Sequence, residues 1–180
     1  MTYLDLFSTP VISRKCEIDN DALLKRVTAF CLKSQPSYFS NVGGEQHHGF
    51  RDVELFTEIG KAIPMRSDVP ETSFNVHAWV NTNTPGSYNK RHHHIDKNII
   101  FSGVYYVVTP EKCGELKFFD PRGPMISEDA ALQYLYQQTT ETITPHAGML
   151  WLFPSWLEHE VTPNLSNRNR ISISFNIICK

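Results

Sequence analysis

Possible metal-binding side chains stand directly before a long apolar run in the stretch Lys90–Val108. Three consecutive histidines, His92–His94, are followed closely by Asp96. One residue separates His94 from Asp96, so an extended chain would direct both side chains to the same face. The run Ile99–Val108 is rich in β-branched and aromatic residues and predicts a buried strand that would hold this pair in place.

A further histidine, His159, lies in the downstream segment FPSWLEHEV, which is also typical of a strand. Two imidazoles and one carboxylate form the facial ligand set of mononuclear non-haem Fe(II) sites and leave the opposite face of the metal open. His94, Asp96 and His159 are therefore candidate ligands. A histidine cluster alone is more often a solvated surface patch, so this interpretation needs support from the rest of the chain.

The last strand-like segment has one polar and one apolar face, because Arg170, Ser172 and Ser174 alternate with large apolar residues. A guanidinium donates two parallel hydrogen bonds to a carboxylate, and a hydroxyl two residues further on shares its face. The cosubstrate 2-oxoglutarate carries a distal carboxylate that needs such an anchor. The alternative is that Arg170 caps a barrel rim or pairs with an acidic surface residue.

Composition limits the classes of function. A chain of 180 residues is long enough for one domain with a substantial core, and a net charge of -2 gives no electrostatic case for nucleic acid or an anionic membrane. The four cysteines have no disulfide or CxxC spacing, which indicates reduced thiols in a cytoplasmic protein. No apolar run approaches membrane-spanning length.

The order of elements predicts an α+β, mainly β domain. The N-terminal part predicts an edge strand over Leu4–Ile12 and a helix over Asp19–Ser34. A polar loop with His47 and His48 follows over Gln35–Gly49, and a second helix over Arg51–Ile63. About eight short strands follow Pro70, interrupted by a helical segment, Ser127–Gln138, that Ser127 would cap. We expect a single domain over residues 1–180, with residues 1–70 as helical support and residues 71–180 as a jelly-roll core.

Five strings in one order carry a family resemblance: SNVGG, AWVNTNTPG, FSGVYYVVTP, GELKFFDPRG and AGMLWLFPSWLEHEVTPNLSNRNRISISFN. From about Leu6 to Asn176 the chain resembles the 2-oxoglutarate/Fe(II)-dependent dioxygenase superfamily, and more narrowly its 2OG-Fe(II) oxygenase branch of bacteria and phages. The resemblance implies a double-stranded β-helix, a cupin-like jelly roll with N-terminal helices packed on its outside.

The resemblance also implies that His94, Asp96 and His159 hold the iron. The triple histidine permits a second register, since His92 with His94 would form H-x-H in place of H-x-D, and much of the branch has H-x-H. Counting back from Ser102 puts His94 and Asp96 at the ligand positions. A carboxylate ligand would also lower the charge of the cation, so the H-x-D register is the one we expect.

For the cosubstrate, the resemblance implies that Arg170 takes the distal carboxylate of 2-oxoglutarate with help from Ser172. A tyrosine on the strand after the H-x-D motif often assists in such enzymes. Tyr106 is preferred over Tyr105 because it shares the parity of His94 along the chain.

The implied activity is hydroxylation of an unactivated C–H bond with Fe(II), 2-oxoglutarate and O2, releasing succinate and CO2, with ascorbate as a reductant in vitro. The substrate would be a prolyl or other peptide, or a small molecule, by analogy with related barrels. Two alternatives stay open: a cupin-like metal enzyme that does not use 2-oxoglutarate, and a barrel that binds a metal or small acid without turnover.

Overall fold

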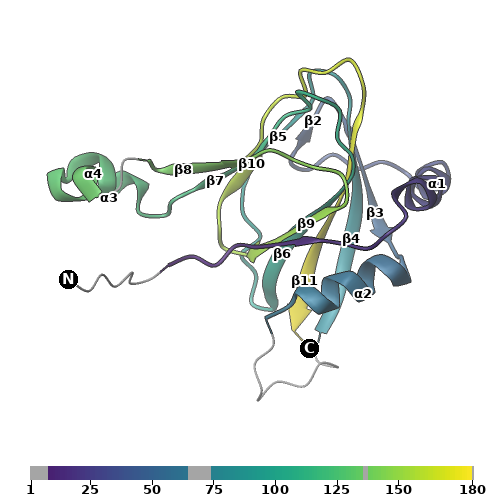
Figure 1. Ribbon diagram of the computed structural model, residues 1–180, viewed down its shortest axis with the longest axis horizontal. Helices are drawn as coiled ribbons and strands as arrows, with labels where there is room; N and C mark the ends of the chain where they lie inside the picture. Colours follow the sequence, from purple (N-terminus) through teal and green to yellow (C-terminus); the bar gives the residue numbers. More distant parts are fainter. Residues whose placement is uncertain (1–7, 65–73, 136–137, 180) are drawn as a thin grey trace.

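The computed structural model describes residues 8–64, 74–135 and 138–179. The eleven strands of the described chain form two antiparallel sheets (Figure 1). The larger sheet contains, in spatial order, β1 (Ile12–Lys15), β9 (Met149–Pro154), β6 (Ile99–Val108), β11 (Arg170–Cys179), β4 (Phe74–Asn83) and β3 (Glu45–Phe50). The smaller sheet contains β2 (Asn41–Val42), β5 (Tyr88–His92), β10 (His159–Val161), β7 (Leu116–Phe119) and β8 (Thr140–Ile143).

From β4 to β7 and again from β8 to β11 the chain alternates between the two sheets, as in a double-stranded β-helix, so the expected jelly-roll fold is confirmed. Strand β11 lies at the middle of the larger sheet and pairs with β6 on one side and β4 on the other. Within the described residues the two sheets remain separate hydrogen-bonded units, and the strands do not close into one continuous barrel.

The four helices of the described chain are α1 (Asn20–Cys31), α2 (Val53–Ala62), α3 (Gly123–Glu128) and α4 (Ala130–Leu135). α1 begins within one residue of its expected start, and α2 begins two residues after Arg51. Both starts are set by carboxylates, those of Asp19 and Asp52, which accept hydrogen bonds from backbone N–H groups of the first turn. Figure 1 shows both helices on one side of the larger sheet, while α3 and α4 project from the far end of β7 and β8.

The main core lies between α1, α2 and the outer face of the larger sheet. The helices bury Leu23 and Leu55 against Ile173 and Phe175 of β11, and all four side chains are inaccessible to solvent. The helices therefore pack outside the jelly roll, as predicted. Because the apolar residues of β11 face this core, the alternating polar residues face the space between the sheets.

Three details differ from the sequence-based expectations. The polar segment Gln35–Gly49 is not a loop throughout, because β2 pairs with β5 and β3 pairs with β4. With β1, these strands make the N-terminal part more than helical support. The expected helix Ser127–Gln138 divides into α3 and α4; Ser127 donates to the carbonyl of Pro124, and Asp129 caps α4 by accepting from Leu132 N.

Some expectations concern residues beyond those described. Of the predicted edge strand Leu4–Ile12, residues 4–7 lie outside the described residues, and residues 8–11 are not in a strand, because β1 begins at Ile12. Residues 71–73 of the predicted core and residues 136–137 of the predicted third helix also lie outside the described residues. No helix in the described part of the chain is long and apolar enough to cross a membrane.

Candidate functional site

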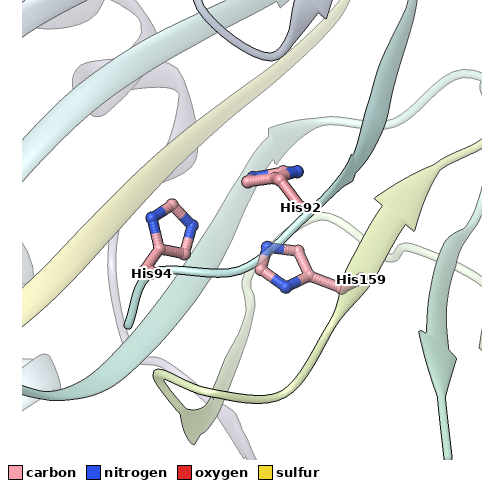
Figure 2. Close-up of side chains that lie close together, drawn as sticks. All are labelled: His92, His94 and His159. Carbon is pink, nitrogen blue, oxygen red and sulfur yellow. The ribbon is translucent and has the colours of Figure 1, made fainter. Parts of the chain in front are cut away.

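Three histidines meet at the open end of the space between the sheets. His92 ends β5, His94 follows it in extended chain, and His159 begins β10 (Figure 2). His159 lies directly opposite His92 in the register of β5 and β10. Each histidine offers a ring nitrogen, and these nitrogens lie within 4.8 Å of one another. Such a group is compact enough to share one metal ion.

Backbone carbonyl groups fix the orientation of two of these rings. Nδ1 of His92 lies 2.6 Å from the carbonyl oxygen of Lys90, and Nδ1 of His159 lies 2.9 Å from that of Leu157. A carbonyl only accepts, so each Nδ1 carries the proton and each Nε2 keeps its lone pair. This is the tautomer that an Nε2 metal ligand requires. The segment bearing His94 is held by a 2.8 Å hydrogen bond from its own backbone N–H to Ser155 O.

Burial keeps all three imidazoles neutral. It lowers the pKa of His92, lowers that of His94 to about 4, and lowers that of His159 to about 3. The neighbouring histidines lower these pKa values further, because like charges would repel. Neutral imidazole is the form that binds a metal, so the cluster has the required protonation state at neutral pH.

Asp96 lies outside this cluster. Its side chain is exposed, and its carboxylate accepts a 3.1 Å hydrogen bond from Asn98 N in the turn before β6. The structure thus joins His94 and His159, as expected, but brings His92 to them in place of Asp96. The reason is the register of β5: His92 is its last residue and faces β10, whereas the chain has left the sheet before it reaches Asp96.

Arg170 lies deeper between the sheets and is 1% exposed. Its Nη1 donates a 2.9 Å hydrogen bond to Cys113 O, while its buried Nε has no partner among the described residues. A buried N–H on a charged group is costly to leave unpaired, so this nitrogen points to an acceptor that the described part of the chain does not supply.

Tyr106 and Ser172 lie beside each other in the register of β6 and β11 and are both buried. Neither hydroxyl is hydrogen-bonded to a described residue, although both side chains line the same cavity as Arg170. Burial raises the pKa of Tyr106 to about 12, so its phenol remains a donor at neutral pH. Tyr105 faces the other way and donates to Asn20 Oδ1 at the outer core.

One cavity contains all of the expected site residues except Asp96. The described residues that line it include His92, His94, His159, Tyr106, Arg170 and Ser172. Gln46, Asn81 and Ser174 also line it and form a chain of hydrogen bonds: Gln46 Nε2 donates to Asn81 Oδ1, and Asn81 Nδ2 donates to Ser174 Oγ. The cavity therefore combines three histidines that could share one metal ion with hydrogen-bond donors that suit an anion.

This arrangement fits an Fe(II) ion with an organic dicarboxylate. Three neutral nitrogens suit a first-row divalent metal and leave part of its coordination sphere open. The unpaired Nε of Arg170, with the free hydroxyls of Tyr106 and Ser172, suits a carboxylate at the far end of the same molecule. Fold and site together define a metal-dependent enzyme of the jelly-roll class.

Comparison with known proteins gives the family. The family model of 2OG-Fe(II) oxygenases matches residues 77–176, more than half of the chain, so the protein belongs to this family. It is an Fe(II)- and 2-oxoglutarate-dependent oxygenase, which confirms the predicted enzyme class and cofactors. No curated protein matches the sequence.

Solved structures agree on the fold. A prolyl-4-hydroxylase from Pseudomonas putida aligns with a TM-score of 0.65 at 16% identity, covering 96% of this chain and 94% of that chain. HygX from Streptomyces hygroscopicus, solved with nickel, 2-oxoglutarate and hygromycin B, aligns with a TM-score of 0.61 at 10% identity, covering 96% of this chain and 84% of that chain. SnoK, a carbocyclase of nogalamycin biosynthesis, aligns with a TM-score of 0.63 at 13% identity, covering 95% of this chain and 80% of that chain.

Two tryptophans and one arginine outside the histidine cluster take different positions. Trp79 lines the cavity, whereas Trp156 is exposed and lies outside it. Arg122 is held by Asp120 in the turn before α3, away from the histidines. Gln46 was hidden in the expected loop; its position becomes clear only when β3 pairs with β4, since that pairing sets Gln46 opposite Asn81.

Proposed function

We propose that the enzyme hydroxylates an unactivated C–H bond, with iron held by His92, His94 and His159 and 2-oxoglutarate held by Arg170. The observation that carries this proposal is the buried, unpaired Nε of Arg170 in the same cavity as the three histidines. When bound, Fe(II) with O2 and 2-oxoglutarate supplies the oxidising power for inserting one oxygen atom, with release of succinate and CO2.

The protein's part is to position and protect. Arg170 and the hydroxyls of Ser172 and Tyr106 hold one end of 2-oxoglutarate, so that its keto acid end points toward the histidines. Phe153 and Leu116 line the same cavity and keep water away from it. Three neutral ligands would leave a bound metal its full charge, which the carboxylate of the keto acid end would partly offset, while the other carboxylate pairs with Arg170.

Succinate formation tests this function. The protein, incubated with Fe(II), 2-oxoglutarate and ascorbate, should release succinate slowly even without its substrate, and faster with it. Candidate peptides and small molecules are screened by mass spectrometry for the gain of one oxygen atom. If the protein binds iron but neither binds 2-oxoglutarate nor forms succinate, it functions as the metal-binding barrel without turnover or as the cupin-like enzyme.

A further inference from the structure

A wide groove opens beside the metal-binding histidines on the outer side of the cavity. Its volume is about 850 Å³, and it shares Trp79, His92 and His94 with the inner cavity. A molecule bound in this groove would therefore reach the cluster without displacing 2-oxoglutarate from Arg170. The residues that line the groove indicate which chemical groups such a molecule would carry.

One wall of the groove is a row of aromatic rings. Phe39, at the rim, meets His48 edge to face with ring centroids 5.3 Å apart. His48 stacks on Trp79 at 5.4 Å with the planes 12° apart, and Trp79 is tilted toward His94 at 5.8 Å. Phe39 is 75% exposed although it is large and apolar. Such a row favours a flat or apolar group lying between the rim and the metal.

The lysine and arginine side chains that line the groove make its charge positive. Arg51, Lys90 and Arg91 line the groove, and no described aspartate or glutamate does. Arg91 is neutralised by Glu158, to which its Nε donates at 2.9 Å. Arg51 and Lys90 are exposed and form no ion pair with any described residue. Two uncompensated cations at the edge of an aromatic groove favour an anionic ligand.

We infer that the substrate of this oxygenase carries an anionic group, held by Arg51 and Lys90, next to an aromatic or apolar group that lies on the Phe39–His48–Trp79 row. This inference rests on the proposed function, because it assumes that the adjoining cluster performs the oxidation. The shared chemistry is an anion beside a ring, and the anion is either a carboxylate or a phosphate ester.

Matched small molecules test the inference. Phenylacetate and phenyl phosphate present a ring with each anion, phenylacetamide removes the charge, and acetate removes the ring. Binding is measured by ligand-observed NMR with the protein saturated under anaerobic conditions with Fe(II) and 2-oxoglutarate, so that Arg170 is already occupied. We expect at least one aromatic anion to bind about five-fold or more tightly than phenylacetamide and acetate, and the preferred one identifies the anion.

Variants connect this preference to the groove. Arg51→Gln with Lys90→Gln should abolish the preference for the anion, whereas Lys25→Gln with Arg168→Gln, at exposed positions elsewhere, should preserve it. Phe39→Ala should weaken both aromatic anions and leave acetate unchanged. The inference is overturned if phenylacetamide binds as well as both anions, or if the Arg51 and Lys90 variant keeps the preference. Loss of 2-oxoglutarate binding in the parent protein would instead overturn the proposed function.

Discussion

His92 lies directly opposite His159 where β5 pairs with β10, and their ring centroids are 4.4 Å apart. This pairing brings two distant parts of the sequence together and, with His94, groups three neutral imidazoles that could share one metal ion. In the proposed site a divalent metal would keep its whole charge, so anion binding would depend on the metal and on Arg170 together.

Removing Arg170 should weaken 2-oxoglutarate binding without loss of iron. Two charge-assisted hydrogen bonds to a largely desolvated carboxylate contribute on the order of 2–5 kcal/mol, so Arg170→Ala should raise the KM for 2-oxoglutarate by roughly 30-fold or more. Arg170→Lys should restore only part of this, because an ammonium keeps the charge but not the planar geometry. Arg168→Ala, at an exposed position, is the control. Equal KM values for the Arg170→Ala and Arg168→Ala variants would exclude the anchor.

Two adjacent tyrosines should give opposite results. Tyr106→Phe removes a hydroxyl that no described residue uses, so stability should hardly change while the KM for 2-oxoglutarate rises about five-fold. Tyr105→Phe removes the 2.5 Å hydrogen bond to Asn20, so it should lower the free energy of unfolding by about 1 kcal/mol without affecting KM. Urea unfolding and succinate kinetics on both variants check this crossed pattern, and a rise in KM for Tyr105→Phe alone would reverse the assignment.

Gly114 should affect 2-oxoglutarate binding indirectly, because the carbonyl group of the preceding residue, Cys113, accepts a hydrogen bond from Arg170. Gly114 has φ of +89°, and a Cβ there would lie 2.2 Å from Thr162 O and 3.0 Å from Nη1 of Arg170. Gly114→Ala should therefore destabilise the fold by about 2 kcal/mol or more and raise the KM for 2-oxoglutarate, because Cys113 O orients Arg170. Gly86→Ala has similar backbone strain, with φ of +83°, but open space around its Cβ. An unchanged KM for Gly114→Ala would show that Arg170 needs no such support.

Glu58 connects α2 to β1 and should make stability depend on pH. Its carboxylate lies 2.5 Å from Lys61 Nζ and 3.1 Å from Arg14 Nε, and the hydrogen bond from Lys61 is the main cause that lowers its pKa below 4.5. A lowered carboxylate pKa stabilises the fold above the unfolded-state pKa, and this contribution disappears as the pH falls through the folded-state value. Glu58→Gln should cost about 1 kcal/mol at pH 7, and the difference should shrink in acid. Thermal unfolding of the parent and of Glu58→Gln at several pH values measures this difference in stability. A difference that stays constant with pH would exclude the ion pair as its source.

The sequence was sufficient for features that depend on local pattern. The alternation around Arg170 correctly predicts which β11 side chains face inward, because a strand has a period of two and the apolar face must meet the core. The expected starts of the two N-terminal helices, Asp19 and Arg51, lie within one and two residues of the starts of α1 and α2. Both depend on neighbours in the chain.

Features that depend on pairing between strands could not be predicted from local sequence pattern. His92, His94 and Asp96 all share one parity, so alternation cannot decide which two approach His159. The decision depends on where β5 ends and how it pairs with β10. The polar segment at Gln46 looks like a loop for the same reason, since its strand forms only because β4 offers an edge to it.

The most direct test of the central claim is iron binding by four proteins: the parent, His92→Ala, Asp96→Ala and His93→Ala. His93 is the matched control, since it is adjacent to both His92 and His94 but exposed and outside the cluster. Anaerobic titration should give about one Fe(II) for the parent and for the Asp96 and His93 variants, and binding weaker by about 100-fold or more for His92→Ala. If Asp96→Ala loses iron while His92→Ala retains it, the ligands are His94, Asp96 and His159, and the three-histidine site is wrong.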